Sequence, residues 1–454
     1  MSCRLRDWSN DLTAFEHLFE DGKGRIKKMK LPILARDEVT EGFMLRAERD
    51  VAKAEKAARA VVDDVRKRGD KAVLEYTKKF DGIDLRAMEV SKDELKRAYD
   101  VIDKDLFSAI QRAYKNIKAF HEKQMPQEMR MEVEPGVEVR RRVVPVRRAG
   151  LYVPGGKAVY PSVVLMLTVP AKVAGVEEVI VCTPPQEEGR LDVASLVAAD
   201  ICGVDRVFKV GGVQAIAAMA YGTETIPKCD AIAGPGGPYV SAAQRLVRND
   251  VRIDFPPGPS EGMVLADKYA NPKYVAADVL SEAEHGPDSA AVLVTDSQEL
   301  ALAVQKEFYY MLKELDEVRR DYVMDNMRKY SGIVLCENMK QAIDFVNEYA
   351  VEHLVVNTKN PEETLKKLTS AGTYCLGPYT PITAGNFAAG PNAILPTGGF
   401  GRAYSGVSVD TFLKRPTVEK LSKDGLKGLQ KAITTLSEFE GFPAHTNSVN
   451  VRFE

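Results

Sequence analysis

The sequence lacks the features that mark several large classes of protein. No segment of its 454 residues reaches the roughly 18 consecutive apolar residues that a membrane-spanning helix needs. The N-terminal segment MSCRLRDWSNDLTAFEHLFEDGKGR mixes acidic and basic side chains without an apolar stretch, which argues against a signal peptide. The formal net charge is −2, so no basic excess indicates a nucleic-acid partner. We therefore expect a cytoplasmic protein that binds neither membranes nor nucleic acids.

Paired cysteines are also absent. The six cysteines are scattered along the chain, and no Cys-x-x-Cys motif occurs. Several of them lie inside apolar runs such as VIVC and IVLC. This pattern favours buried, reduced thiols over a metal site built from cysteines.

The residues that are present divide the chain into a helical front end and two alternating blocks. Within residues 39–80 and within residues 91–124, apolar residues recur at spacings of three and four, which predicts amphipathic helices. From about Val143, short apolar runs such as EEVIVC and DRVFKV alternate with helical segments of about ten residues. A second block alternates in the same way through SAAVLVT, SGIVLCEN, HLVVNT and GTYCLG. This alternation predicts two α/β units built from parallel β-α-β crossovers, followed by a C-terminal tail beyond about Pro381. Within the first block, Pro170 is expected to kink or break the buried helix that contains it.

Three glycine-rich loops each follow a predicted strand and precede a predicted helix. They are PGG at 154–156, VGGVQ at 210–214 and GPGGP at 234–238. Backbone amides at a helix start can hold a cofactor phosphate. None of the loops matches G-x-G-x-x-G followed by an acid about 20 residues later, so the usual dinucleotide fingerprint is missing. A fourth loop, PPGPSEG at 256–262, suits either an active-site loop or a plain turn.

Two histidines have acidic neighbours that suit chemistry. Glu282 and His285 lie three residues apart at the end of a predicted helix, where both side chains share one face and could bind one metal. Glu352 and His353 lie where a helix gives way to a strand, and an adjacent carboxylate and imidazole suit proton transfer. A surface or structural role is the commoner explanation of such a spacing as in the first pair, and a helix-end salt link is the commoner explanation of the second. Of the remaining histidines, His17 is expected to be a surface or packing residue, His121 a helix-capping residue and His445 a tail residue.

Taken in order, the motifs form a specific series. The chain contains GLYVPGG, VGGVQAIAAMAYGT, IAGPGGPYV, IDFPPGPSE, LSEAEHGPDS, VEHL, GNFAAGPNAILPTGG, SVDTFLKR and EGFPAHTNSV. This series resembles the histidinol dehydrogenase family from about residue 40 to the end of the chain.

The resemblance implies a fold and an activity. The expected fold is α/β, with two incomplete Rossmann-like domains, a helical N-terminal region and a small C-terminal segment, in an intertwined homodimer. The expected boundaries are an N-terminal arm over 1–40, a discontinuous first domain over 41–150 and 262–380, a second domain over 151–261, and a C-terminal segment over 381–454. The family binds zinc and oxidises an amino alcohol through the aldehyde to the amino acid in two NAD-dependent steps.

The resemblance also assigns residues to roles. The expected acid/base pair is Glu352 and His353. The expected metal ligands are Glu282, His285, Asn386 and His445, which also touch the substrate. The expected NAD contacts are Tyr152, Gln214 and Gly237. The further substrate contacts are Ser260, His353 and Glu440.

Four of these positions depart from the family pattern. The family usually has Gln where this chain has Glu282, and Asp where it has Asn386. The ligand shell keeps two histidines, one carboxylate and one amide, so we expect it to retain zinc, with manganese possible. Gly237 replaces the asparagine of a GPGN loop, and Ala393 replaces the substrate-binding histidine of a GPNHVLPT motif.

The departures leave the substrate open. Losing a hydrogen-bonding contact can change discrimination between substrates by orders of magnitude. L-Histidinol is one expected substrate, and the alternative is a paralogue that oxidises another small polar alcohol or diol, for example a sulfonated or carboxylated one. Arg402 and Lys414 either meet such an anionic group or are solvated surface charges. An inactive NAD-binding protein and a structural scaffold are disfavoured because the acid/base pair and both metal-site histidines are intact. The choice between NAD and NADP stays open.

Overall fold

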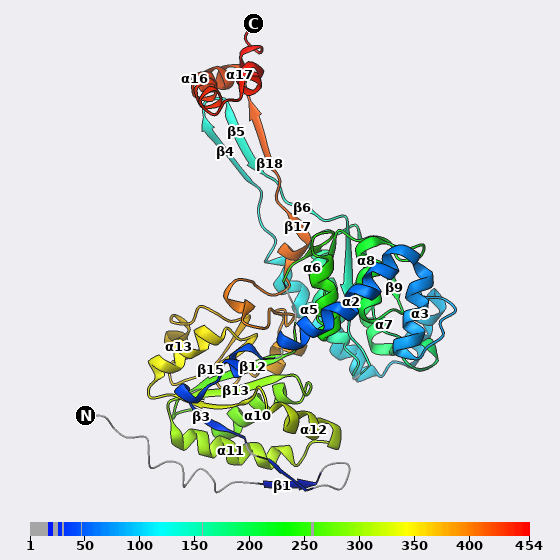
Figure 1. Ribbon diagram of the computed structural model, residues 1–454, viewed down its shortest axis with the longest axis vertical. Coiled ribbons are helices and arrows are strands. Elements are labelled where there is room, and N and C mark those ends of the chain that lie inside the picture. The colour runs from blue at the N-terminus through cyan, green and yellow to red at the C-terminus, as the bar shows by residue number, and fades with distance from the viewer. Residues whose placement is uncertain (1–16, 21–25, 30, 47, 157, 256–257) are drawn as a thin grey trace, which may run out of the picture.

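The computed structural model describes residues 17–20, 26–29, 31–46, 48–156, 158–255 and 258–454. It shows two α/β lobes and an arm that extends away from both of them (Figure 1). Among the described residues, no helix is long and apolar enough to cross a membrane. Five cysteines, Cys182, Cys202, Cys229, Cys336 and Cys375, are buried and free, which confirms the expectation of buried thiols there. Cys3 lies outside the described residues.

The first lobe contains a parallel five-stranded sheet in the order β11-β10-β7-β8-β9. Its strands are β7 (Arg148–Tyr152), β8 (Glu178–Cys182), β9 (Arg206–Phe208), β10 (Ala231–Ala233) and β11 (Arg252–Ile253). The short apolar strands are covered on both faces, as is usual for parallel sheets. The chain order reverses between β7 and β10, and in open α/β sheets such a reversal leaves a crevice at the carboxyl ends of the strands.

Helices cover both faces of this sheet. The crossover helices are α6 (Pro161–Val173), α7 (Val193–Ile201), α8 (Gly212–Tyr221) and α9 (Pro238–Val247). The N-terminal helices α2 (Glu48–Arg68), α3 (Asp70–Asp81), α4 (Lys92–Val101) and α5 (Lys104–Glu122) were predicted from their periodicity. They contact α6, α7, α8 and α9, so this part of residues 41–150 lies with the first sheet and not with the second.

Pro170 does not break α6, contrary to the sequence expectation. Proline removes the amide that would bond the carbonyl four residues earlier, here Met166. The side-chain amide of Asn392 donates to that carbonyl oxygen at 2.6 Å instead. The helix therefore continues to Val173 with its freed acceptor satisfied.

The second lobe contains a parallel six-stranded sheet in the order β16-β15-β12-β13-β14-β3. Its strands are β3 (Ile33–Ala35), β12 (Glu261–Ala266), β13 (Ala290–Thr295), β14 (Gly332–Leu335), β15 (His353–Asn357) and β16 (Thr373–Leu376). Its helices are α10 (Pro272–Ala283), α11 (Gln298–Leu312), α12 (Glu317–Asn326), α13 (Met339–Tyr349), α14 (Pro361–Leu365) and α15 (Ile382–Phe387). From β12 to β16 the strand order repeats that of the first sheet, so the sequence's two α/β units are confirmed.

The arm joins segments that are far apart in the sequence. Strands β4 (Met129–Glu134), β5 (Val137–Arg141) and β18 (Thr417–Leu421) form an antiparallel sheet, with a short β6 (Val144–Pro145) and β17 (Leu413–Lys414) pair at its base. Helices α16 (Lys423–Phe439) and α17 (Pro443–Asn450) form its tip (Figure 1). The remaining elements, the hairpin β1 (His17–Glu20) and β2 (Ile26–Met29) and the short α1 (Glu41–Leu45), lie at the N-terminal end.

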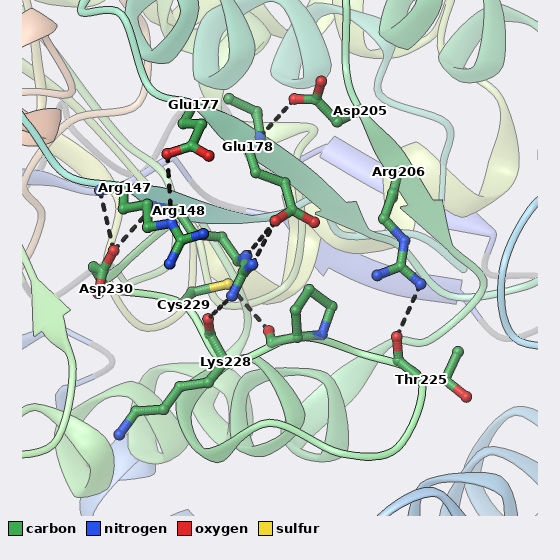
Figure 2. Close-up of polar contacts among 12 residues, drawn as sticks. Arg147, Arg148, Glu177, Glu178, Asp205, Arg206, Thr225, Lys228, Cys229 and Asp230 are labelled. Atoms are coloured by element: carbon green, nitrogen blue, oxygen red, sulfur yellow. Dashed lines mark hydrogen bonds and ion pairs between the residues drawn. The ribbon is translucent and has the colours of Figure 1, made fainter.

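Charged residues close the N-terminal edge of the first sheet (Figure 2). Arg148 forms an ion pair with Glu178 at 2.6 Å and donates to the carbonyl of Lys228 at 2.8 Å. Asp230 accepts hydrogen bonds from the backbone amides of Arg147 and Arg148 at 3.1 and 2.9 Å. These contacts link the starts of β7, β8 and β10, so they stabilise this edge of the sheet.

Candidate active site

The amino-terminal edge of the second sheet carries the residues that suit proton transfer and metal binding. Glu261 is the first residue of β12, and His353 is the first residue of β15. The two strands are neighbours, and His353 lies opposite Gly262 in their register. Ligands of open α/β sheets normally bind at the carboxyl ends of the strands. In this lobe the candidate catalytic groups lie at the amino ends instead.

Helix α10 brings Glu282 to the same edge. The helix returns against the strand direction, and Glu282 lies in its last turn. A Cβ added at Gly262 would lie 2.1 Å from Cγ of Glu282, so only glycine leaves room for this side chain. Glu282 is 1% exposed, and neither of its carboxylate oxygens has a hydrogen-bond partner among the described residues. His285 follows the helix, with its Nδ1 4.0 Å from the Glu282 carboxylate and its side chain 39% exposed.

Glu352 and His353 form a buried pair. His353 Nδ1 lies 3.6 Å from Glu352 Oε2, and the same oxygen accepts a hydrogen bond from the Glu261 amide at 2.8 Å. Burial alone would lower the pKa of His353, but the Glu352 carboxylate reverses this and raises it. Burial raises the pKa of Glu352, an effect that His353 opposes. Neither ring nitrogen of His353 has a hydrogen-bond partner among the described residues, so the imidazole is available to a ligand.

The donor set fits a divalent cation but is incomplete within the described part of this chain. Asn386, in α15, has a buried Oδ1 without a hydrogen-bond partner there. Together with both Glu282 oxygens, it gives oxygen donors that burial leaves unsatisfied, which a metal would satisfy. No group of three His, Cys, Asp or Glu side chains that could hold a metal occurs among the described residues.

The other two expected site residues lie elsewhere. Glu440 directly follows α16 and His445 lies in α17, so both are at the tip of the arm (Figure 1). Both are exposed. One copy of the chain therefore leaves these residues away from the edge that carries Glu282 and His353.

The expected cofactor residues lie at the carboxyl edge of the first sheet, at the end of β7 and the starts of α8 and α9. Tyr152 ends β7, and its hydroxyl accepts a hydrogen bond from the Gly212 amide at 3.1 Å. Burial raises the pKa of Tyr152 to about 12, so the phenol stays protonated. Gln214 is fully buried, and its side-chain amide has no hydrogen-bond partner among the described residues. A Cβ at Gly234 would lie 2.1 Å from the Tyr152 carbonyl oxygen, which holds the third glycine loop against β7. Gly237 is exposed, and a Cβ there would meet nothing within 4 Å.

The remaining candidates have simpler surroundings. Ser260 is half-buried beside Glu261, and its carbonyl accepts from the Ala290 amide at 3.0 Å. Ala393 contacts Met166 through its amide and packs against the apolar cluster around α6. Arg402 donates to the carbonyls of Glu348 and Gly399, whereas Lys414 is exposed in β17.

Two other histidine readings can be compared with the structure. His121 is fully buried, and its Nδ1 lies 2.8 Å from the Ile117 carbonyl oxygen. Its Nε2 lies 3.4 Å from the Asn392 amide. His121 therefore packs inside the lobe and supports the loop that carries Ala393. His17 lies in β1.

Sequence reasoning missed Glu261 and Arg46. Glu261 is 4% exposed and lies between Ser260 and Gly262. Arg46 is 6% exposed, and its Nε lies 3.3 Å from Glu261 Oε1. The acid directly after Ser260 in the PPGPSEG loop was a visible signal, but nothing in the sequence pairs it with Arg46.

Comparisons with known proteins agree with the motif series. Residues 44–453 match a family model described as histidinol dehydrogenase. A histidinol dehydrogenase of Methanothermobacter thermautotrophicus is 44% identical over 86% of this chain and 92% of that protein. One of Synechocystis is 45% identical over 90% of this chain and 94% of that protein. The crystal structure of histidinol dehydrogenase from Elizabethkingia anophelis is 38% identical, covers 94% of this chain and 98% of its own, and superimposes with a TM-score of 0.86.

Proposed function

Because the chain belongs to the histidinol dehydrogenase family and is an NAD-dependent oxidoreductase of that type, we propose that it oxidises a small polar alcohol through the aldehyde to the acid. The first step is R–CH2OH + NAD+ → R–CHO + NADH + H+. The aldehyde then adds water to give R–CH(OH)2. The second step is R–CH(OH)2 + NAD+ → R–COOH + NADH + H+. The observation that carries this proposal is the buried pair of Glu352 and His353, together with a buried Glu282 carboxylate that has no hydrogen-bond partner among the described residues.

The protein's own residues account for the proton movements. His353 accepts the hydroxyl proton as hydride leaves the carbon, since its ring nitrogens have no hydrogen-bond partner among the described residues and the Glu352 carboxylate stabilises the imidazolium that forms. Glu352 takes a proton from the water that adds to the aldehyde. His353 Nδ1 lies 3.6 Å from the Glu352 carboxylate. Tyr152 and Gln214 hold the dinucleotide in the crevice of the first sheet, with Gly237 beside it.

The residues at the edge of the second sheet fit a divalent cation. Glu282, His285 and Asn386 supply carboxylate, imidazole and amide donors, a set that suits zinc and also manganese. A bound cation supplies Lewis-acid polarisation and orientation of the substrate. Ser260 lies beside these residues and contributes a substrate contact.

A homodimer completes the site in this proposal. His445 and Glu440 of one copy are brought to the edge of the second sheet in the other copy, as fourth metal ligand and substrate contact. The exposed apolar residues of the arm tip support this, because Leu436 is 61%, Phe442 50% and Phe439 89% exposed. Exposed apolar clusters of this kind mark interaction surfaces. An arm that reaches away from its own lobes presents them to a second copy.

The substrate has two candidates. L-Histidinol follows from the family. A different polar alcohol or diol, for example a sulfonated or carboxylated one, is favoured by Ala393, which puts a methyl group packed against an apolar cluster where the family has a polar side chain. Arg402 does not favour the anionic version, because its Nε and Nη2 donate to backbone carbonyls.

The test is NADH formation by the zinc-loaded protein with L-histidinol and a panel of small polar alcohols and diols. Turnover of histidinol would support the family activity. Turnover of another alcohol with histidinol inert would support the paralogue. Binding of NAD without turnover of any alcohol would overturn the proposal.

A further inference from the structure

Arg46 occupies an unusual position at the end of α1. Its backbone has a φ of 51°, a region that residues other than glycine seldom adopt. Its side chain fixes this conformation, because Nη2 donates to the Tyr349 carbonyl at 2.6 Å and Nη1 to the Met44 carbonyl at 3.2 Å. The guanidinium also lies 3.5 Å from the centre of the Tyr349 ring. Arg46 also forms the ion pair with Glu261.

Glu261 connects Arg46 to the candidate active site. Its Oε1 accepts a hydrogen bond from the Gly398 amide at 2.8 Å in addition to the ion pair. Its own amide donates to the Glu352 carboxylate. Arg46, Glu261 and Glu352 thus form a continuous chain of contacts from the N-terminal segment to the acid/base pair.

The charges of Glu261 and Glu352 explain why these contacts include the cation of Arg46. Glu261 and Glu352 are both buried carboxylates, and two such charges side by side repel one another. Arg46 offsets the charge of Glu261, so Glu261 keeps its place and presents its amide to Glu352. Among the described residues, Arg46 is the cation that forms an ion pair with Glu261, and its loss would leave a buried charge uncompensated, which is strongly unfavourable.

We propose that Arg46 and Glu261 are positioning residues that hold the Glu352 carboxylate in place for the aldehyde step. This inference rests on the proposed function, in which Glu352 takes the proton of the attacking water. A displaced Glu352 would slow oxidation of the aldehyde more than oxidation of the alcohol, for which His353 is the base. Loss of stability alone would not separate the two steps.

A second Arg–Glu pair, whose arginine also contacts a ring of α13, offers a matched control. Arg36 forms an ion pair with Glu348 at 2.5 Å, and its guanidinium lies 4.9 Å from the centre of the Phe345 ring. Both pairs therefore join an arginine to an aromatic ring of α13. The control pair is more exposed, and its described contacts do not reach Glu352.

The experiment measures kcat and KM separately with L-histidinol and with its aldehyde, or with the alcohol and aldehyde that the substrate panel selects. The test variants are Arg46→Met, Glu261→Gln and the double variant. The control variants are Arg36→Met and Glu348→Gln. We expect each single change in the first pair to lower kcat for the aldehyde at least roughly tenfold, with a smaller effect on the alcohol. The double variant, which leaves no uncompensated charge, should recover kcat for the aldehyde to within about threefold of the native value. The control variants should change neither step.

Three outcomes would overturn the inference. They are equal losses in both steps, losses in the double variant that simply add, and control variants that are as damaging as Arg46→Met. If Arg46→Met does not fold, Glu261→Gln and the double variant carry the same comparison. A native protein that oxidises no alcohol or aldehyde would overturn the proposed function itself, whereas native activity with additive losses would overturn this inference alone.

Discussion

The side-chain amide of Asn392 donates a hydrogen bond to the Met166 carbonyl in α6, which Pro170 leaves without a helical donor. Replacing Asn392 with alanine would leave this buried acceptor unsatisfied, so we expect the free energy of unfolding to fall by about 1–3 kcal/mol. Urea unfolding of the Asn392→Ala variant measures the change. Adding Pro170→Ala restores a backbone donor four residues after Met166, and the double variant should regain part of the loss. No recovery would contradict this account of α6.

Glycine at position 262 makes room for Glu282. The Cβ of Gly262→Ala would lie 2.1 Å from Cγ of Glu282 and would force the carboxylate to move. We expect metal affinity to fall at least roughly tenfold, since ligand orientation sets affinity. Elemental analysis after dialysis against buffered zinc gives the readout. Gly385→Ala is the control, because a Cβ there meets nothing within 4 Å although its neighbour is Asn386. Equal zinc content in the native and Gly262→Ala proteins would count against a metal at Glu282.

The exposed loop at Gly237 has space for a side chain. We expect Gly237→Asn, which restores the family residue, to fold normally and to lower the KM for NAD roughly threefold or more by adding one hydrogen bond to the cofactor. Steady-state kinetics with varied NAD check this. Gly234→Asn should instead lose stability, because its Cβ would lie 2.1 Å from the Tyr152 carbonyl oxygen. An unchanged KM for Gly237→Asn would place the dinucleotide away from this loop.

His353 is the expected base for the alcohol. Changing it to alanine should lower kcat by roughly 100- to 10,000-fold, the usual contribution of a general base. Zinc content and NAD binding should stay near native, because this residue is not among the expected metal ligands or NAD contacts. Substantial turnover by His353→Ala would show that another group takes the proton.

The arm tip gives a test of assembly by mixing two inactive proteins. His353→Ala and His445→Ala should each be inactive alone. If His445 acts in the second copy, refolding them together at equal concentration yields about a quarter of the native number of intact sites, because half of the dimers are mixed and each has one such site. Activity that stays at background after mixing would place His445 in the site of its own chain, or outside any site.

The sequence predicted most of the fold because its elements obey simple periodicity. The two α/β units, the amphipathic N-terminal helices and the three glycine loops are all present. Strand β12 was not predicted, since its first residues, Glu261 and Gly262, are typical of loops and are explained only by contacts with other elements. The arm was not predicted either. Its β4 segment MRMEVE alternates apolar and polar residues, but all six residues are exposed, so this alternation does not mark a buried face.

The site was less predictable than the fold. Helical spacing explains why Glu282 and His285 lie together, but motif resemblance was needed to relate them to Asn386 and His445. The opposition of Gly262 and His353 depends on strand register, and the pairing of Arg46 with Glu261 depends on long-range packing. Neither is encoded in local spacing.

The expected cofactor residues lie at the carboxyl edge of the first sheet, and the candidate catalytic residues lie at the amino edge of the second. This difference has an electrostatic consequence. At the crevice of the first sheet, α8 and α9 present their N-termini, where the helix dipole carries a partial positive charge that favours the phosphates of a dinucleotide. At the amino edge of the second sheet, α10 and α13 present their C-termini, which carry the opposite partial charge. The two sheets share one strand order, but the first uses its carboxyl edge and the second its amino edge. The first lobe therefore has a field suited to an anion, and the second lobe a field suited to a cation.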